Sequence, residues 1–153
     1  IARNILPDRR DAEECVNDTW LGAWNAMPEN RPGLLAPFLG KITRNLAFTR
    51  WRAGHTEKRG RGELPLVLDE LADCASTENT LQTLEAAELE EAVNRFLRTL
   101  PERECSVFLR RYWFTEPMAD IARRYGMREA TVRTSLFRSR EKLRRHLEKE
   151  GLL

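Results

Sequence analysis

The residues best suited to chemistry lie in a basic stretch near the end of the chain, over 128–140. An Arg side chain can donate two hydrogen bonds to the edge of a guanine, and a Thr or Ser hydroxyl can bond to a base or a phosphate. Side chains of these types at the start of one helix are suited to the major groove of DNA. The predicted set is Arg128, Thr131, Arg133, Thr134, Phe137, Arg138 and Arg140.

Two helices and a tight turn are expected to position this set. Residues 115–125 have apolar side chains at helical spacing and end at Gly126, which adopts a positive φ easily. A second helix is expected over about 129–148, with Val132 and Leu136 inward and Arg side chains outward. A short helix, a glycine turn and a basic helix predict a helix-turn-helix motif. A basic, solvated helix in an ordinary helical bundle is the alternative.

A second basic group lies on a helix expected over about 34–52. Apolar residues recur along it at helical spacing, and cations and hydrogen-bonding groups occupy the other positions. Cations that track phosphates, interleaved with aromatic rings, are typical of surfaces that bind nucleic acid. The candidates are Lys41, Arg44, Asn45, Arg50, Trp51 and Arg52. Trp51 is equally well explained as a core aromatic residue.

The first long helix is acidic instead. It is predicted to begin after an N-cap at Asp8 and to end at Pro28, with an apolar stripe at helical spacing. Acidic residues are favourable near a helix N-terminus, but here they continue beyond the first turn, which suggests a partner-binding face. The candidates are Asp11, Glu14, Asn17, Asp18 and Trp20. Trp24 is assigned to the core, and Trp20 is equally well explained by burial.

Charges alternate in sign along the chain. Residues 1–30 sum to −3, 31–62 to +7, 63–102 to −8 and 103–153 to +6, within a net charge of +2. Basic segments concentrate polyanions such as nucleic acid. Residues 54–83 contain glycines, a proline and acids without periodicity, and predict a flexible linker with limited structure. We therefore expect an all-α protein with two small helical modules, over 1–53 and 84–153, the second a helix-turn-helix.

Several classes of function are disfavoured. No apolar run approaches the roughly 20 residues that a membrane span needs, so we expect no membrane insertion. Cys15, Cys74 and Cys105 lie far apart without a CxxC pair, which argues against a metal site and fits a reducing cytoplasm. His55 and His146 are the two histidines, and no catalytic or nucleotide-binding motif is present. We expect no enzyme, no cofactor and no small-molecule substrate.

Two separate parts of the chain resemble one protein family. Leu100-Pro-Glu-Arg-Glu, followed by Ile121-Ala, Gly126, Thr131-Val132 and Phe137-Arg-Ser-Arg, is similar to region 4 of bacterial sigma factors. The stretches Asp11-Ala-Glu-Glu-Cys-Val-Asn-Asp-Thr-Trp and Phe38-Leu-Gly-Lys-Ile-Thr-Arg-Asn-Leu-Ala resemble their region 2. Because both occur in the family's order, the chain resembles the small, extracytoplasmic-function (ECF) class of the sigma-70 superfamily.

The resemblance implies a function and partners. Sigma factors bind core RNA polymerase and direct transcription initiation by reading the −10 and −35 elements of promoter DNA. The resemblance places the acidic candidates of the first long helix on the polymerase. It places the 41–52 candidates at the −10 element and the 128–140 candidates at the −35 element. It also implies an anti-sigma factor as partner, and a first helix whose start is missing before Ile1.

One residue departs from the family pattern, and one alternative function stays open. Arg128 stands where the family usually has a small polar N-cap such as Ser, so a cap worth roughly 1 kcal/mol is expected to be missing. Arg128 could meet a DNA phosphate instead. The alternative is a stand-alone helix-turn-helix regulator that binds DNA as a dimer, although no a/d heptad seam is visible.

Overall fold

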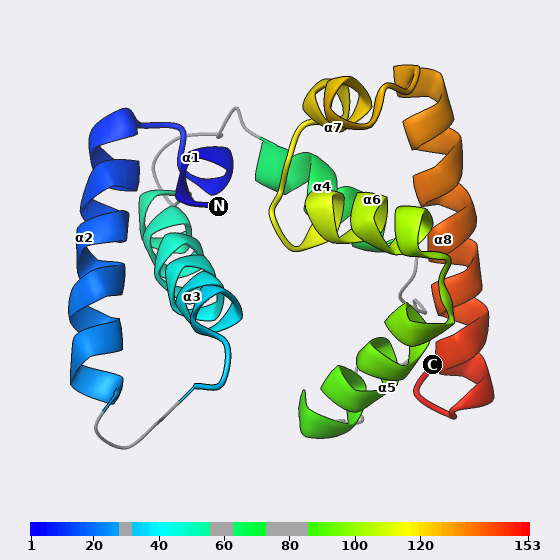
Figure 1. The fold of residues 1–153 in the computed structure, drawn as a ribbon, viewed down its shortest axis with the longest axis horizontal. Helices are drawn as coiled ribbons and strands as arrows, with labels where there is room; N and C mark the ends of the chain where they lie inside the picture. Colours follow the sequence, from blue (N-terminus) through cyan, green and yellow to red (C-terminus); the bar gives the residue numbers. More distant parts are fainter. Residues whose placement is uncertain (28–31, 56–62, 73–85) are drawn as a thin grey trace. The chain divides into compact units, whose positions relative to one another are not determined.

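The computed structural model describes residues 1–27, 32–55, 63–72 and 86–153, and within these ranges every regular element is an α-helix (Figure 1). The helices are α1 (Ala2–Ile5), α2 (Arg9–Ala26), α3 (Leu35–His55), α4 (Glu63–Ala72), α5 (Ala86–Thr99), α6 (Glu102–Tyr112), α7 (Met118–Tyr125) and α8 (Glu129–Lys149). The chain divides into two compact units, Ile1–Pro65 and Leu66–Leu153. The predicted all-α fold with two helical modules is confirmed.

Helix α4 lies within the segment that was predicted to have limited structure, so that prediction is wrong for residues 63–72. Its composition includes Pro65, which usually interrupts a helix. Here Pro65 stands in the first turn, where its missing N–H removes no hydrogen bond of the helix. The other residues of the predicted linker, apart from the end of α3, lie outside the described ranges.

The first unit consists mainly of α2 packed against α3, with α1 beside both. Helix α2 begins as predicted, because the Asp8 carboxylate accepts hydrogen bonds from the backbone N–H groups of Arg10 and Asp11 at 2.7 and 3.3 Å. The two long helices approach closely at Gly22, where an added Cβ would lie 3.4 Å from Ile42 Cγ2. Small side chains therefore determine which face of α2 is buried.

The buried stripe of α2 is narrower than its apolar pattern predicted. Its buried residues are Ala12, Cys15, Thr19 and Ala23. The large residues beside them are exposed instead: Trp20 keeps 57% of its surface and Trp24 keeps 77%. The prediction that Trp24 is a core residue is wrong. Because α3 packs closely against the small residues of α2, the indole rings lie outside the contact.

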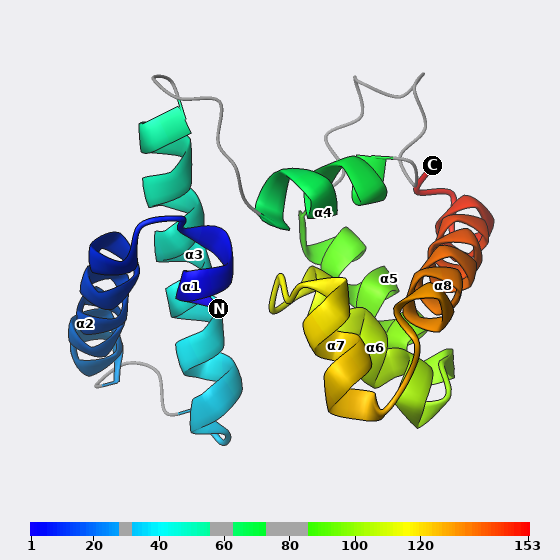
Figure 2. The same cartoon turned by 90° about the horizontal axis from the view of Figure 1, so that it is seen from above.

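In the second unit, α6, α7 and α8 surround a core that also includes α5, as two perpendicular views show (Figures 1 and 2). Phe96 and Phe108 meet edge to face at 5.9 Å between ring centres. Val132 and Leu136 of α8 are fully buried in the same core, and so is Val67 of α4. Burying these apolar side chains fixes the orientation of α8 within the unit.

Candidate nucleic-acid interface

The turn between α7 and α8 has the geometry of a helix-turn-helix. Gly126 has φ 60° and ψ 36°, in the left-handed region, and the N–H of Met127 donates to the carbonyl of Ala122 at 2.9 Å. Glycine adopts this conformation without the penalty that a Cβ brings. The predicted glycine turn is confirmed, and it directs the start of α8.

The start of α8 lacks a side-chain cap. Its N-cap residue is Arg128, whose backbone is extended and whose side chain accepts no hydrogen bond from the helix. The expectation of a missing cap is therefore confirmed. Glu129 in the first turn supplies a favourable negative charge near the free N–H groups.

One face of α8 is open to solvent and lines a hollow in the second unit. Thr131, Thr134 and Arg138 are exposed and line it together with Arg128. Arg103 of α6 lines the same hollow and donates to the carbonyl of Tyr125 at 2.8 Å. Sequence reasoning missed Arg103, since nothing local to α6 indicates that it lies beside the start of α8.

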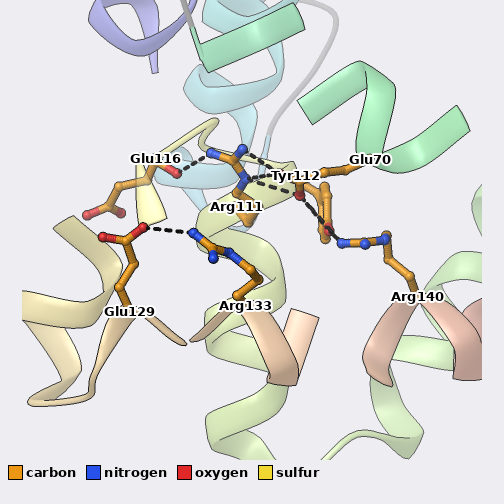
Figure 3. Close-up of polar contacts among 7 residues, drawn as sticks. All are labelled: Glu70, Arg111, Tyr112, Glu116, Glu129, Arg133 and Arg140. Atoms are coloured by element: carbon orange, nitrogen blue, oxygen red, sulfur yellow. Dashed lines mark hydrogen bonds and ion pairs between the residues drawn. The ribbon is translucent and has the colours of Figure 1, made fainter. Parts of the chain in front are cut away.

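Two more predicted residues extend this exposed face. Arg133 is 68% exposed and forms an ion pair with Glu129 one turn earlier, at 3.3 Å (Figure 3). Phe137 is 56% exposed, which is unusual for a large aromatic side chain. Five of the predicted residues besides Arg128 thus share the exposed side of α8: Thr131, Arg133, Thr134, Phe137 and Arg138.

Arg140 does not share this exposed face, so the structure does not bring it together with the other residues predicted to contact DNA. Its side chain is 13% exposed and turns toward the inside of the unit. Its Nη1 donates to the Tyr112 hydroxyl at 2.8 Å and lies 3.5 Å from a carboxylate oxygen of Glu70 (Figure 3). A cation at this position of a basic helix predicts a solvated side chain, but the acid that holds Arg140 comes from a distant part of the sequence.

Beneath α8, Glu70 joins the same polar network to α6. Its carboxylate accepts hydrogen bonds from Arg111 Nη2 at 2.6 Å and from Arg111 Nε at 3.2 Å. The Tyr112 hydroxyl donates to the other oxygen at 3.0 Å. Burial raises the pKa of Tyr112 well above its usual range, so the phenol stays protonated at neutral pH. No local sequence pattern indicates this network, because Glu70 lies in the predicted linker.

A buried carboxylate, that of Glu116, fixes the loop between α6 and α7. Glu116 is 6% exposed and forms ion pairs with Arg110 at 3.5 Å and with Arg124 at 2.9 Å. Its backbone carbonyl accepts a hydrogen bond from Arg111 at 3.1 Å. The preceding Thr115 has a positive φ of 54°, which non-glycine residues rarely adopt. The network holds this strained corner and with it the position of α7.

The structure divides the basic candidates of α3 into different environments. Lys41, Asn45 and Arg52 are exposed, and their spacing of four and seven residues places them on one side of the helix. Arg44 is partly buried with its guanidinium 4.7 Å from the ring centre of Phe48, and burial lowers its pKa from the ordinary value. Trp51 packs against the core of the first unit.

Arg50 points away from that side of α3 and contacts α2. Its guanidinium donates to Glu14 at 2.8 Å and also to Asp18. The hydrogen bonds that Arg50 donates to these two carboxylates raise its pKa above the ordinary value. Two residues predicted to bind a protein partner are therefore joined to one predicted to bind DNA, and all three form a link between α2 and α3.

The exposed face of α2 is more apolar than predicted. Trp20 and Asn17 are exposed as proposed, and Asp11 is exposed near the start of the helix. The same face also carries exposed large apolar residues that the prediction left out: Val16, Leu21, Trp24 and Met27. Trp20 and Trp24, four residues apart, were the sequence signal for such a surface. Exposed apolar clusters of this kind mark protein-binding surfaces.

The potential metal ligands, the apolar character of the helices and the cysteines bear on which other functions are possible. Within the described ranges, no cluster of three or more His, Cys, Asp or Glu side chains is placed to hold a metal ion. None of the helices described is long and apolar enough to cross a bilayer. Cys15 is buried and Cys105 is partly buried, and burial raises the pKa of both thiols. Cys74 lies outside the described residues.

Comparison with known proteins matches both units. Residues 1–56 match Sigma-70 region 2 and residues 90–143 match Sigma-70, region 4. The RNA polymerase sigma-E factor of Streptomyces avermitilis is 27% identical over 99% of this chain and 79% of its own length. The sigma-E factor of Streptomyces antibioticus is 26% identical over 97% of this chain and 77% of its own length. The probable RNA polymerase sigma factor RfaY of Xanthomonas campestris is 28% identical over 96% of this chain, which covers 36% of that protein.

Proposed function

This chain belongs to the sigma-70 family of RNA polymerase sigma factors, in the ECF class, and from that premise we propose which of its surfaces bind polymerase and which read promoter DNA. Its function is to bind core RNA polymerase and direct initiation at specific promoters. The observation that carries the proposal is the presence, in one chain, of an exposed aromatic face on α2 and an exposed Arg and Thr face on α8.

The exposed face of α8 is proposed to read the −35 element. A helix-turn-helix inserts the start of its second helix into the major groove, where Arg can bond a guanine and Thr can bond bases or phosphates. Arg133, Thr134, Phe137 and Arg138 are proposed for base reading. Arg128 and Thr131, at the N-terminal end, are proposed for phosphate contacts. Arg140 is left out, because its guanidinium is held by Tyr112 and Glu70.

Helix α3 is proposed to hold the −10 element. Lys41, Asn45 and Arg52 form the exposed side of the helix, with Arg44 beside them. Cations at this spacing can track the backbone of a single strand. Trp51 supports the helix through packing against the core of the first unit. Arg50 is proposed as a link to α2, since Glu14 and Asp18 already hold it.

The exposed face of α2 is proposed to dock on core polymerase. Large aromatic side chains near the centre of an interface contribute most of its binding energy, and charges at the rim steer association. Trp20 and Trp24 are the proposed anchors, with the exposed Asn17 about one turn before Trp20 and the exposed Asp11 near the start of the helix. An anti-sigma factor that covers this face would keep the protein inactive, because an exposed apolar surface is available to a partner of either kind.

We further propose that the chain has no catalytic activity of its own and works in the cytoplasm. Among the described residues, the carboxylates of Glu70 and Glu116 are engaged in ion pairs that tie helices together, which supports a structural role for them instead of a catalytic one. Chromosomal DNA and RNA polymerase are in the bacterial cytoplasm, so a factor that binds both is expected there.

A binding assay with core polymerase tests the docking proposal. Bacterial core enzyme immobilised on beads is incubated with the parent chain, with a Trp20→Ala and Trp24→Ala double variant, and with Leu34→Ala. Leu34 is a matched control, because it is 74% exposed but does not lie on α2. The parent and the control should be retained, and the double variant should be lost. Equal retention of all three proteins would refute the assignment of α2.

A further inference from the structure

A carboxylate outside the helix-turn-helix determines where one cation of α8 lies. Glu70 comes from α4, yet its side chain belongs to the second unit and is 17% exposed. Both of its oxygens accept hydrogen bonds, from Arg111 at 2.6 Å and from the Tyr112 hydroxyl at 3.0 Å. Arg111 is almost fully buried, with 2% of its side chain exposed. A buried charge such as that of Arg111 persists only when it is paired, so the Glu70 carboxylate is the group that this network requires.

Arg140 is the member of this network that comes from α8. It reaches Glu70 directly at 3.5 Å, and it reaches it again through the Tyr112 hydroxyl at 2.8 Å (Figure 3). Its guanidinium carbon also lies 5.9 Å from the ring centre of Phe137, which is exposed on the DNA-facing side of α8. Arg140 therefore lies next to that face while its charge is directed to the inside.

We propose that Glu70 is a positioning residue for promoter reading, which holds Arg140 away from the DNA-facing side of α8. The proposal rests on the proposed function, because it takes the exposed face of α8 as the face that meets DNA. It means that a residue between the two stretches that match the family sets how many cations of α8 meet phosphates. Those matches cover residues 1–56 and 90–143 and do not include Glu70.

Removal of the Glu70 charge has a defined consequence. Arg140 then loses the attraction of the Glu70 carboxylate 3.5 Å away, so its guanidinium is held inside less strongly and shifts toward solvent. From its place beside Phe137 it gains access to the exposed face, where a DNA phosphate supplies a new anion. Each added phosphate contact steepens the dependence of log affinity on log salt by about 0.9. Glu70→Gln keeps the shape of the side chain, and Val67 keeps α4 anchored in the core.

The test measures binding of the full chain to a fluorescein-labelled DNA duplex of mixed sequence by fluorescence anisotropy. Salt is varied from about 50 to about 200 mM. Glu70→Gln should bind more tightly at low salt and lose about threefold more affinity than the parent over this range, as one added phosphate contact requires. Asp69→Asn is the matched control, since Asp69 is an exposed acid on the same helix. It should leave the salt slope unchanged.

Two further variants identify the released cation. A Glu70→Gln and Arg140→Gln double variant should return to the slope of the parent. Arg140→Gln alone should leave the slope of the parent unchanged, because Arg140 is held inside there. The proposal is overturned if Glu70→Gln and Asp69→Asn shift binding equally, or if the double variant keeps the steeper slope. If Glu70→Gln fails to fold by circular dichroism, Arg140→Gln alone decides, and a lower slope for it overturns the proposal.

Arg138→Gln separates this proposal from the proposed function. Arg138 lies on the exposed face, and on a duplex of mixed sequence its guanidinium meets phosphates instead of a matched base, so its loss should lower the slope by about 0.9. If Arg138→Gln lowers the slope but Glu70→Gln leaves it unchanged, the DNA face is supported and the role of Glu70 falls. If Arg138→Gln has no effect, the assignment of the face itself is wrong.

Discussion

Substitution of Arg128 by Ser should stabilise the second unit and weaken its binding to DNA. Arg128 is the N-cap of α8, with φ −76° and ψ 143°, and its side chain makes no capping hydrogen bond. Asp8, the N-cap of α2, has a similar backbone, with φ −88° and ψ 131°, and caps its helix through two N–H groups. A Ser at 128 would therefore have the backbone geometry that capping requires.

The size of the stability effect follows from capping energies. A Ser, Thr, Asp or Asn cap contributes about 1 kcal/mol relative to Ala. For a unit of the size of Leu66–Leu153, 1 kcal/mol corresponds to a rise in Tm of roughly 4 to 8 °C. Removal of a cation from the positive end of the helix adds a smaller gain of about 0.3–1 kcal/mol. Arg128→Ala is the matched control, because it removes the same charge without providing a cap.

The effect on DNA has the opposite sign. If Arg128 meets a phosphate, its loss should lower the salt slope of duplex binding by about 0.9 in both Arg128→Ser and Arg128→Ala. Calorimetry of the full chain measures stability, and fluorescence anisotropy measures binding. Arg128→Ser should be more stable than Arg128→Ala by about 1 kcal/mol, with the same slope. Equal stability of the two variants would refute the capping argument, and an unchanged slope would refute the phosphate contact.

Three further predictions concern the turn and the buried polar groups of the second unit. Gly126→Ala should destabilise this unit by about 1 kcal/mol in calorimetry, because φ is +60° and the added Cβ meets no atom within 4 Å, so the cost lies in the backbone alone. Gly126→Asn should cost less, and an equal cost for the two variants would contradict the argument. Ser139→Ala should leave the free energy of unfolding unchanged or raise it by up to about 2 kcal/mol, because the buried Ser139 hydroxyl has no hydrogen-bond partner among the described residues. A clear loss of stability in urea unfolding would show that this hydroxyl does have a hydrogen-bond partner. Burial raises the pKa of Tyr112 above 10.0, so the contribution of the protonated phenol to stability is complete below that pH and is lost as the pH rises further. Tyr112→Phe should therefore show a smaller alkaline loss of stability than the parent in unfolding curves between about pH 9 and 12. Identical losses in the two proteins would argue against a buried, protonated Tyr112.

Features that depend on neighbours in the sequence were predictable. Asp8 caps α2, Gly126 ends α7 and Arg128 leaves α8 without a cap, and each follows from residue type and local spacing. The exposed Thr and Arg side chains near the start of α8 follow in the same way from helical periodicity. Such features are determined within one or two turns of the chain, where pattern and propensity are most informative.

Features that depend on distant partners were not predictable. Arg140 was assigned to DNA, but Glu70 and Tyr112 hold it inside the second unit. Arg50 was assigned to the same function, but Glu14, 36 positions earlier, accepts its hydrogen bond. The side chains alone would suit either role. Only the packing of the helices shows which acid reaches which cation.

Which apolar residues of α2 are buried could also not be predicted from the sequence. Trp24 fits an apolar helical stripe, but the contact with α3 runs along the smaller residues around Gly22. A stripe of mixed large and small apolar residues does not show which part faces the neighbouring helix. The error is informative about function, because the displaced indole rings form the face that we propose for polymerase binding.

The most direct test of the sigma-factor function is run-off transcription with bacterial core RNA polymerase on a set of promoter templates. We predict that core alone gives no defined transcript and that addition of the chain gives initiation at a fixed position on selected templates. The Trp20→Ala and Trp24→Ala double variant should abolish this activity, and Arg98→Gln, an exposed cation on α5, should retain most of it. If core polymerase is unaffected while the chain alone binds a duplex tightly and specifically, the protein is a stand-alone regulator and the account is contradicted.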